Sequence, residues 1–109
     1  MSETRKKIRI ISEDEILISL LTGLLGDIYE ISDSADVDGI IFDQSATKSN
    51  NTPVSITALN SAAEPVPVFF IGYADDEQEL AALNAGAADY MAKPFNPDIL
   101  KLRVTRIFP

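Results

Sequence analysis

The sequence contains no cysteine and no histidine. Without cysteine the chain can form no disulfide, offers no thiolate ligand to a metal and has no thiol nucleophile. Without histidine it lacks the commonest general base, the commonest zinc ligand and one member of a Ser-His-Asp triad. It cannot carry a phosphohistidine either. Any chemistry of this chain must therefore use carboxylates, lysine, hydroxyl groups or a bound metal.

Long hydrophobic runs are also missing. The segment Leu20–Leu25 is interrupted by Thr22 and Gly23 and is far too short to span a bilayer. The basic residues at the start of the chain are not followed by the apolar core of a signal peptide. We therefore expect a cytoplasmic protein that does not bind membranes.

Length and charge narrow the class further. The 109 residues fit one domain, 1–109, in which we expect residues 1–7 to be a flexible basic N-terminus. The formal net charge of −8 disfavours nucleic acid binding.

Short apolar runs alternate with segments of helical periodicity along the chain. The run at residues 39–43 is almost entirely apolar, which is typical of a strand covered on both faces. The alternation predicts an α/β domain with a doubly wound parallel sheet. The expected strands are 8–11, 29–32, 39–43, 67–71 and 88–91, and the expected helices are 12–27, 52–64, 75–86 and 96–108. The expected caps are Ser12, Thr52 and Asn96 at helix starts, and Gly26 and Gly86 at helix ends.

Polar side chains follow the expected strands where each one ends. Glu13 and Asp14 follow the first strand, Asp43 ends the third and Lys93 follows the fifth. Functional groups in such sheets gather at the carboxyl edge, so these side chains should converge. Three carboxylates stay ionised together only beside a cation, and Mg²⁺ suits oxygen ligands. Asp43, as the central carboxylate, is the natural nucleophile for an aspartyl-phosphate.

Each of these residues also has a plainer interpretation. An acidic pair at a helix start stabilises the helix through its dipole and cap. An aspartate at a strand end is commonly a turn residue, and a lysine before proline commonly lies at the surface. The combination at several strand ends is what favours a site.

Three segments, "IRIISEDE", "GIIFD" and "GAADYMAKPF", resemble the receiver (CheY-like) domains of bacterial two-component response regulators. The resemblance implies a flavodoxin-like fold with five parallel strands in the order 2-1-3-4-5. It also implies that Glu13 and Asp14 hold Mg²⁺ together with Asp43 and the backbone carbonyl of Ser45. Asp43 would be the phosphoacceptor, and Lys93 would contact the phosphoryl group.

The last segment carries two further implications of the resemblance. Tyr90 falls on the aromatic switch position of the family, and the Lys93–Pro94 peptide bond would be cis. The sequence departs from the family at Gly72, where receivers carry a threonine or serine hydroxyl, so coupling to Tyr90 should be weakened or absent. It departs again at Tyr73, where a small residue is usual. Tyr73 would either occlude the pocket or occupy the place to which Tyr90 would swing.

Two connections also differ from the family. Only Asp33–Asp38 separate the second and third strands, and six extended residues reach only about 20 Å. We therefore expect the second helix to be missing or reduced to a turn, leaving one sheet face partly uncovered. The segment Gln44–Thr52 after the phosphoacceptor is long and polar, and we expect it to be mobile.

These features leave more than one function open. The first is an atypical receiver in a phosphorelay that accepts phosphate on Asp43 with Mg²⁺, from a sensor histidine kinase or a phosphotransfer protein. The alternative is a pseudo-receiver that signals by protein contact without phosphorylation. An aspartate-nucleophile phosphatase is disfavoured because Ser45 stands where its second aspartate would be, and a flavodoxin-type cofactor binder because "SEDE" would repel a phosphate.

The expected chain is not an enzyme beyond its own phosphorylation and dephosphorylation at Asp43. A homodimer or a downstream protein would use the face made by the family's fourth helix, fifth strand and fifth helix. In this sequence these are residues 75–86, 88–91 and 96–108.

Overall fold

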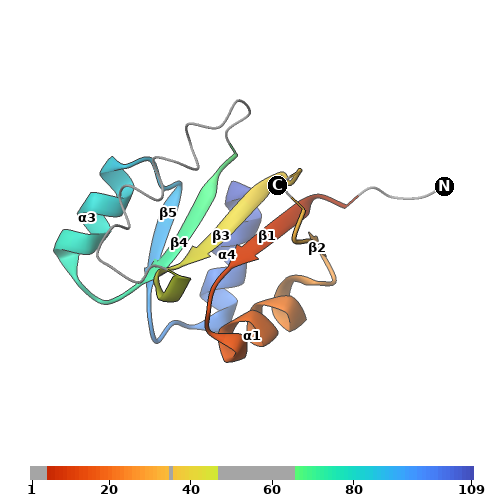
Figure 1. Ribbon diagram of the computed structural model, residues 1–109, viewed down its shortest axis with the longest axis horizontal. Coiled ribbons are helices and arrows are strands. Elements are labelled where there is room, and N and C mark those ends of the chain that lie inside the picture. Colours follow the sequence, from red (N-terminus) through yellow and green to blue (C-terminus); the bar gives the residue numbers. More distant parts are fainter. Residues whose placement is uncertain (1–4, 35, 47–65) are drawn as a thin grey trace.

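The computed structural model describes residues 5–34, 36–46 and 66–109, and these ranges contain five strands, three α-helices and one 3-10 turn (Figure 1). In chain order the elements are β1 (Lys7–Ile11), α1 (Glu15–Leu25), β2 (Glu30–Ile31), β3 (Gly39–Asp43), the 3-10 turn η1 (Gln44–Ala46), β4 (Val68–Gly72), α3 (Asp76–Asn84), β5 (Asp89–Ala92) and α4 (Pro97–Ile107). The predicted helix over 52–64, with its Thr52 cap, lies outside the described residues.

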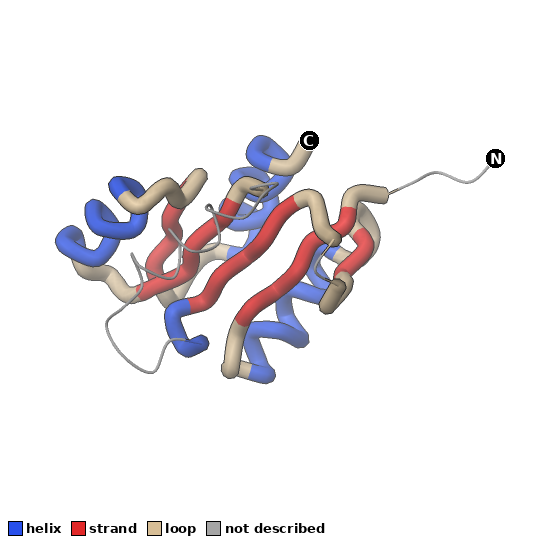
Figure 2. Tube along the Cα trace, turned by 45° about the horizontal axis from the view of Figure 1, so that its top comes forward, coloured by secondary structure: helices blue, strands red, loops and turns tan. Residues whose placement is uncertain are grey.

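The strands form one parallel sheet in the order β2-β1-β3-β4-β5, as predicted. Helices α1 and α4 lie together on one face of this sheet, and α3 lies apart from them (Figure 2). All residues of β3 and of β4 are buried, which confirms that the central strands are covered on both faces. The carboxyl ends of the strands therefore meet at one edge, as the topology of a parallel sheet requires.

Each face of the sheet carries its own hydrophobic core. The core on the α1 and α4 side contains Leu21 and Leu100 packed against Ile41 and Phe69. The core on the other side contains Phe42, Phe70, Tyr90 and Ala82 of α3. Side chains along a strand alternate between these two cores, because the side-chain repeat of a strand is two residues.

Two of the predicted helix caps are confirmed, and one at a helix start is wrong. Asn96 caps α4 with Pro97 at its first position, and Gly26 caps the end of α1. The start of α1 is capped by Asp14 and not by Ser12, because Asp14 accepts hydrogen bonds from the N–H groups of Ile16 and Leu17.

The end of α3 also differs slightly from the prediction. Ala85 is the C-cap, and Gly86 follows it with φ of 109°, a left-handed conformation that favours glycine.

The first strand begins one residue earlier than predicted: Lys7, the last residue of the expected N-terminal segment 1–7, is the first residue of β1. Arg5 donates a hydrogen bond to the Gly26 carbonyl at 2.9 Å, while residues 1–4 lie outside the described residues.

No helix stands between β2 and β3 in the described part of that connection, as predicted. Turn contacts replace it: the Ser32 hydroxyl accepts from the Ser34 N–H, and Asp38 accepts from the Lys7 N–H at 2.8 Å. The Asp38 N–H donates to the Lys7 carbonyl, so this short connection is tied directly to β1.

Among the described helices, none combines the length and the apolar character needed to cross a bilayer.

A buried contact between Tyr29 and Phe108 lies at the end of the sheet opposite its carboxyl edge. The Tyr29 hydroxyl donates to the Phe108 carbonyl at 2.6 Å, and the two rings meet edge to face at 6.4 Å. Phe108 fills the space beside Gly39, where an added Cβ would lie 2.4 Å from its ring. Phe108 is therefore part of the core.

Replacing Tyr29 by phenylalanine should lower the free energy of unfolding by about 1–2 kcal/mol, because the buried Phe108 carbonyl loses its donor. Urea unfolding of both proteins measures this difference. Tyr73→Phe is the matched control, since the Tyr73 side chain is 56% exposed and its hydroxyl should be dispensable. Equal losses in the two variants would contradict the proposed importance of the Tyr29 hydrogen bond.

Candidate functional site

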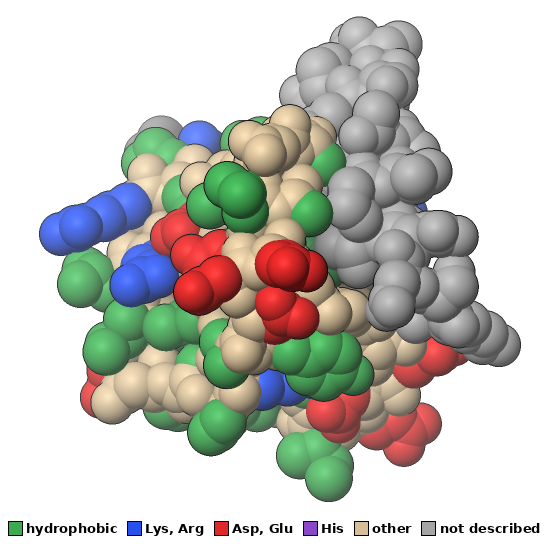
Figure 3. Space-filling model, turned by 90° about the vertical axis from the view of Figure 1, so that its left-hand side faces the viewer, with side chains coloured by type: hydrophobic (Ala, Val, Ile, Leu, Met, Phe, Trp, Pro, Cys, Tyr) green, Lys and Arg blue, Asp and Glu red, His purple; other side chains and the backbone are tan. Residues whose placement is uncertain are grey.

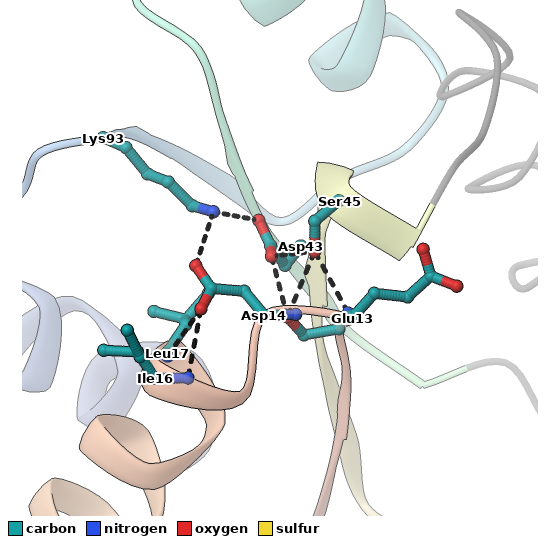
Figure 4. A network of polar contacts seen from close by, with 8 residues as sticks. Glu13, Asp14, Ile16, Leu17, Asp43, Ser45 and Lys93 are labelled. Carbon is teal, nitrogen blue, oxygen red and sulfur yellow. Dashed lines mark hydrogen bonds and ion pairs between the residues drawn. The ribbon is translucent and has the colours of Figure 1, made fainter.

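The carboxyl edge of the sheet brings together three of the side chains predicted from the sequence (Figure 4). Asp43 is the last residue of β3, Asp14 caps the helix that follows β1, and Lys93 follows β5. The Lys93–Pro94 bond at this edge is cis, as predicted. These residues are far apart in the sequence and meet only because their strands are neighbours in the sheet.

Lys93 is the cation of this cluster. Its ammonium lies 2.9 Å from Asp43 Oδ1 and 3.7 Å from Asp14 Oδ2. The Asp43 side chain is completely buried, whereas those of Lys93 and Asp14 are 29% and 37% exposed. A buried carboxylate requires such a partner, because an unpaired charge in the interior is strongly unfavourable. The interpretation of Lys93 as an ordinary surface lysine is therefore wrong.

Two serine hydroxyls hold the other oxygen of Asp43. Ser12 Oγ lies 2.7 Å from Asp43 Oδ2, and Ser45 Oγ also contacts Oδ2. Ser12 Oγ accepts from the Asp14 N–H at 2.9 Å, and Ser45 Oγ accepts from the Glu13 N–H at 3.1 Å. A backbone N–H can only donate, so each hydroxyl is free to donate its own hydrogen to the carboxylate.

These contacts decide the charge state of Asp43. Burial works to raise the pKa of its carboxyl, but the hydrogen bond from Ser45, the Lys93 ammonium and the hydrogen bond from Ser12 together outweigh burial. The pKa of Asp43 therefore lies below its ordinary value, and the side chain is a carboxylate at neutral pH.

The predicted magnesium ligands are not arranged around a common point. The Glu13 side chain is exposed, and its carboxylate points away from Asp43 (Figure 4). Asp14 uses one oxygen to cap α1, and Ser45 contacts Asp43 through its hydroxyl. Among the described residues no group of three acidic side chains is placed to hold a metal. As these side chains lie they do not fit Mg²⁺, and its binding stays a prediction.

Tyr90 lies inside the domain and not at its surface. Its ring is 3% exposed and stacks on Phe70 with centroids 5.3 Å apart, and its hydroxyl donates to the Tyr73 carbonyl at 2.5 Å. A Cβ added to Gly72 would lie 2.4 Å from the Tyr90 oxygen. Tyr90 thus fills space that a larger residue at position 72 would need.

Burial raises the pKa of Tyr90, with further contributions from the charges of Glu79 and Asp75, against a smaller opposing effect of the hydrogen bond to Tyr73. The Tyr90 hydroxyl therefore keeps its proton and donates. Of the two alternatives for Tyr73, the one in which it occupies the place to which Tyr90 would swing is wrong, because Tyr90 itself fills the interior space beside Gly72 and the Tyr73 side chain is 56% exposed.

The sequence alone did not reveal the roles of Ser12 and the Ser45 side chain, and it favoured Ser12 as a helix cap. One signal was present: Ser12 is a polar residue directly after an apolar strand, at the edge where the site was expected. The direction of its hydroxyl depends on where Asp43 lies, 31 residues away.

An apolar groove of about 400 Å³ borders this cluster. It is lined by Ile16 and Leu20 of α1 and by Pro94 and Phe95, with Lys93 at its edge. Ile16 is 83% exposed, which is unusual for a side chain of its size. The groove offers an apolar contact surface beside Asp14 and Lys93 of the cluster.

Sequence comparisons find no relative: no protein-family model and no curated protein matches the chain. Structure comparison does. The BeF3-activated receiver domain of DrrB, a Thermotoga maritima OmpR/PhoB homolog, matches with a TM-score of 0.84 and 22% identity over 96% of this chain and 98% of that chain. A two-component response regulator from Clostridium difficile gives 0.83 and 24% identity over 95% and 96% of the two chains.

An orphan response regulator of H. pylori matches with a TM-score of 0.77 and 18% identity, covering 97% of this chain and all of that chain. At these identities the likeness shows the fold. The chain has the fold of response regulator receiver domains, as the three sequence segments predicted.

Proposed function

We propose that this domain accepts a phosphoryl group on Asp43 and acts in phosphorelay signalling as an atypical receiver. The observation that carries the proposal is the ion pair of buried Asp43 with Lys93, 2.9 Å apart, at the carboxyl edge of a receiver-like sheet. A purely structural domain has no need of a buried carboxylate, because apolar residues of similar volume are usually at least as stabilising.

The proposed reaction uses the oxygen that faces Lys93. Asp43 Oδ1 gives an electron pair to phosphorus, and the bond from phosphorus to the donor nitrogen or oxygen breaks with its electrons left on the donor. Lys93, which is partly exposed, then pairs with the phosphoryl oxygens in place of Oδ1. Phosphorylation adds close to two negative charges, which an ammonium group at this position would offset. The domain catalyses nothing beyond this gain and the later loss of its own phosphoryl group.

The donor would be a sensor histidine kinase or a phosphotransfer protein, and the apolar groove beside Lys93 suits its docking. A helix of the donor could cover Ile16 and Leu20 while it brings its phosphoryl group to Asp43. This proposal accounts for large exposed side chains directly next to the cluster.

A homodimer or a downstream protein would contact the face made by α3, β5 and α4. Acidic and hydrophobic side chains lie side by side over α3 (Figure 3). Large exposed apolar residues on this face are Leu80 and Leu83 of α3 and Ile99 and Leu102 of α4. Such a face gives a partner both an apolar contact area and charges that define its orientation.

A second candidate function is a pseudo-receiver that signals by contact without phosphorylation. It is favoured by Tyr90, which is already held inside by Phe70 and by the Tyr73 carbonyl. With Gly72 in place of a hydroxyl residue, no described side-chain hydroxyl from the end of β4 links the Asp43 cluster to Tyr90. In this case the surface around Tyr73 has one conformation, whatever the state of Asp43.

Beryllofluoride, a phosphoryl mimic, should shift the backbone amide resonances around Asp43 and Lys93, and acetyl phosphate should add one phosphoryl group as measured by intact mass. Asp43→Asn should lose both responses, because the amide is a poor nucleophile. Each titration is done with and without Mg²⁺. If the wild-type protein gives no shift and no adduct under either condition, the phosphoacceptor proposal is wrong.

The same Asp43→Asn variant separates the two candidate functions. If partner binding and the cellular response depend on Asp43, the domain works as a phosphoacceptor. If both are unchanged in Asp43→Asn, while a variant of the exposed face such as Leu80→Asp abolishes them, the pseudo-receiver is the correct description.

A further inference from the structure

Asp43 Oδ2 is held by a network of hydrogen bonds from two serines, which are in turn held by the backbone. Ser12 and Ser45 both direct their hydroxyls at this oxygen, and their own oxygens lie 3.2 Å apart. Each serine oxygen also accepts one backbone N–H, from Asp14 and from Glu13 respectively. These contacts link the loop after β1, the turn after β3 and the carboxylate.

We infer that Ser12 and Ser45 are positioning residues that hold Asp43 Oδ2 in place of a divalent cation. Asp43 would then work without a metal. The inference rests on the proposed function for its chemical consequence, but its first part, a carboxylate oxygen that is closed to metals, stands on the hydrogen bonds alone.

The capacity of a carboxylate oxygen supports this inference. Each oxygen of a carboxylate offers about two acceptor sites, and two hydroxyl donors occupy both sites on Oδ2. A cation that binds Oδ2 must displace these hydrogens. The serines cannot simply turn away, because the N–H groups of Glu13 and Asp14 would then lose their acceptors.

The neighbouring acids point to the same conclusion. Asp14 Oδ1 accepts the N–H groups of Ile16 and Leu17 at the start of α1, and its Oδ2 faces the Lys93 ammonium. The Glu13 carboxylate points away from Asp43 (Figure 4). Lys93 supplies the positive charge that Oδ1 needs, so both oxygens of Asp43 have partners without a bound cation.

The chemical consequence concerns which oxygen reacts. With Oδ2 held by two hydroxyls, Oδ1 is the oxygen left to form the bond to phosphorus, while the donor's bond to phosphorus breaks and its electrons stay with the donor. The two hydroxyl hydrogens and Lys93 stabilise the carboxylate in one orientation before the donor arrives. Fixing the nucleophile in this way saves the cost of orienting it during the reaction.

The test is a titration with Mg²⁺, and with Mn²⁺ as a paramagnetic probe, followed by backbone amide resonances. The wild-type protein should show no saturable shift or line broadening at Asp43 and Asp14 at millimolar cation. Ser12→Ala/Ser45→Ala, which frees Oδ2, should show a saturable shift at millimolar cation, which corresponds to binding at least roughly tenfold tighter than that of the wild-type protein. Ser12→Thr and Ser45→Thr keep a hydroxyl and should behave as wild type. Ser19→Ala, an exposed serine on α1, is the matched control.

Saturable binding of Mg²⁺ by the wild-type protein, with shifts centred on Asp43, would overturn the inference, whatever the double alanine variant does. The wild-type titration decides this point even if the double variant does not fold. A second experiment measures the reaction with acetyl phosphate, either with Mg²⁺ or with a metal chelator. The wild-type protein should react equally under both conditions, and the double alanine variant should react only when Mg²⁺ is present. Failure of all proteins to react refutes the proposed function, and the cation titration then still decides whether the serines close Oδ2 to metals.

Discussion

Gly72→Ala is expected to lower the free energy of unfolding by about 1–3 kcal/mol, the usual cost of overpacking a well-packed interior. The added Cβ would lie 2.4 Å from the Tyr90 oxygen and 2.9 Å from Phe70 Cε1, closer than real contacts allow. Tyr90 would have to give up its hydrogen bond to the Tyr73 carbonyl or its stacking on Phe70. The variant thus tests whether the inward position of Tyr90 depends on the absence of a side chain at position 72.

Thermal and urea unfolding measure the loss, with Gly23→Ala as the matched control. Gly23 lies inside α1 with no atom near its absent side chain, so alanine there should stabilise the protein by roughly 0.5–1 kcal/mol. Tyr90→Leu should recover part of the loss when combined with Gly72→Ala, because the smaller side chain makes room. If the effects of Gly72→Ala and Tyr90→Leu simply add, the two positions do not compete for space and the account of Tyr90 is wrong.

Lys93→Met is expected to destabilise the domain by about 2–3 kcal/mol. Removing one partner of a buried ion pair costs about 3–5 kcal/mol, and partial exposure of the Lys93 side chain reduces this amount. The variant leaves Asp43 buried with only the two serine hydroxyls as partners. Lys101→Met is the matched control, since Lys101 pairs at 3.9 Å with a largely exposed Asp27 and should contribute little.

The pH dependence of this loss has a definite sign. The Asp43 pKa is lowered in the folded protein, so its ionisation stabilises the fold above the ordinary value of 3.8, and this contribution is lost as the pH falls through the folded pKa. The difference between wild type and Lys93→Met should therefore be full at neutral pH and shrink as acid protonates Asp43. A difference that stays constant down to acid pH would mean that the ion pair is not its cause.

A large part of this fold could be predicted from local patterns. The runs at 8–11 and 39–43 are strands and the periodic segment after Ser12 is a helix, because run length and periodicity depend only on neighbouring residues. The strand order followed from the resemblance of three segments to receiver domains. The Asn96 and Gly26 caps follow from local chemistry, whereas the Ser12 cap failed because Asp14 competes for the same N–H groups.

Part of the candidate site could also be predicted from the sequence, and part of it could not. Asp14, Asp43 and Lys93 could be named because each stands at a strand end, and parallel strands bring such ends together. The direction of the Glu13 carboxylate could not be predicted, because a side chain at a strand end can turn toward the cluster or toward solvent. In the structure Glu13 is exposed, and no three-acid group is placed to hold a metal in the described part of the chain.

The sequence by itself determined the alternating strands and helices, the residues at the carboxyl edge and the missing hydroxyl at Gly72, because all of these are properties of short segments. Only the tertiary structure decided what surrounds Asp43 and Tyr90. Ser12 reaches Asp43 across 31 residues, and Tyr90 reaches the Tyr73 carbonyl across 17. Such contacts depend on how strands and loops sit within a fraction of an ångström of one another, and the chemistry of any one segment does not specify that distance.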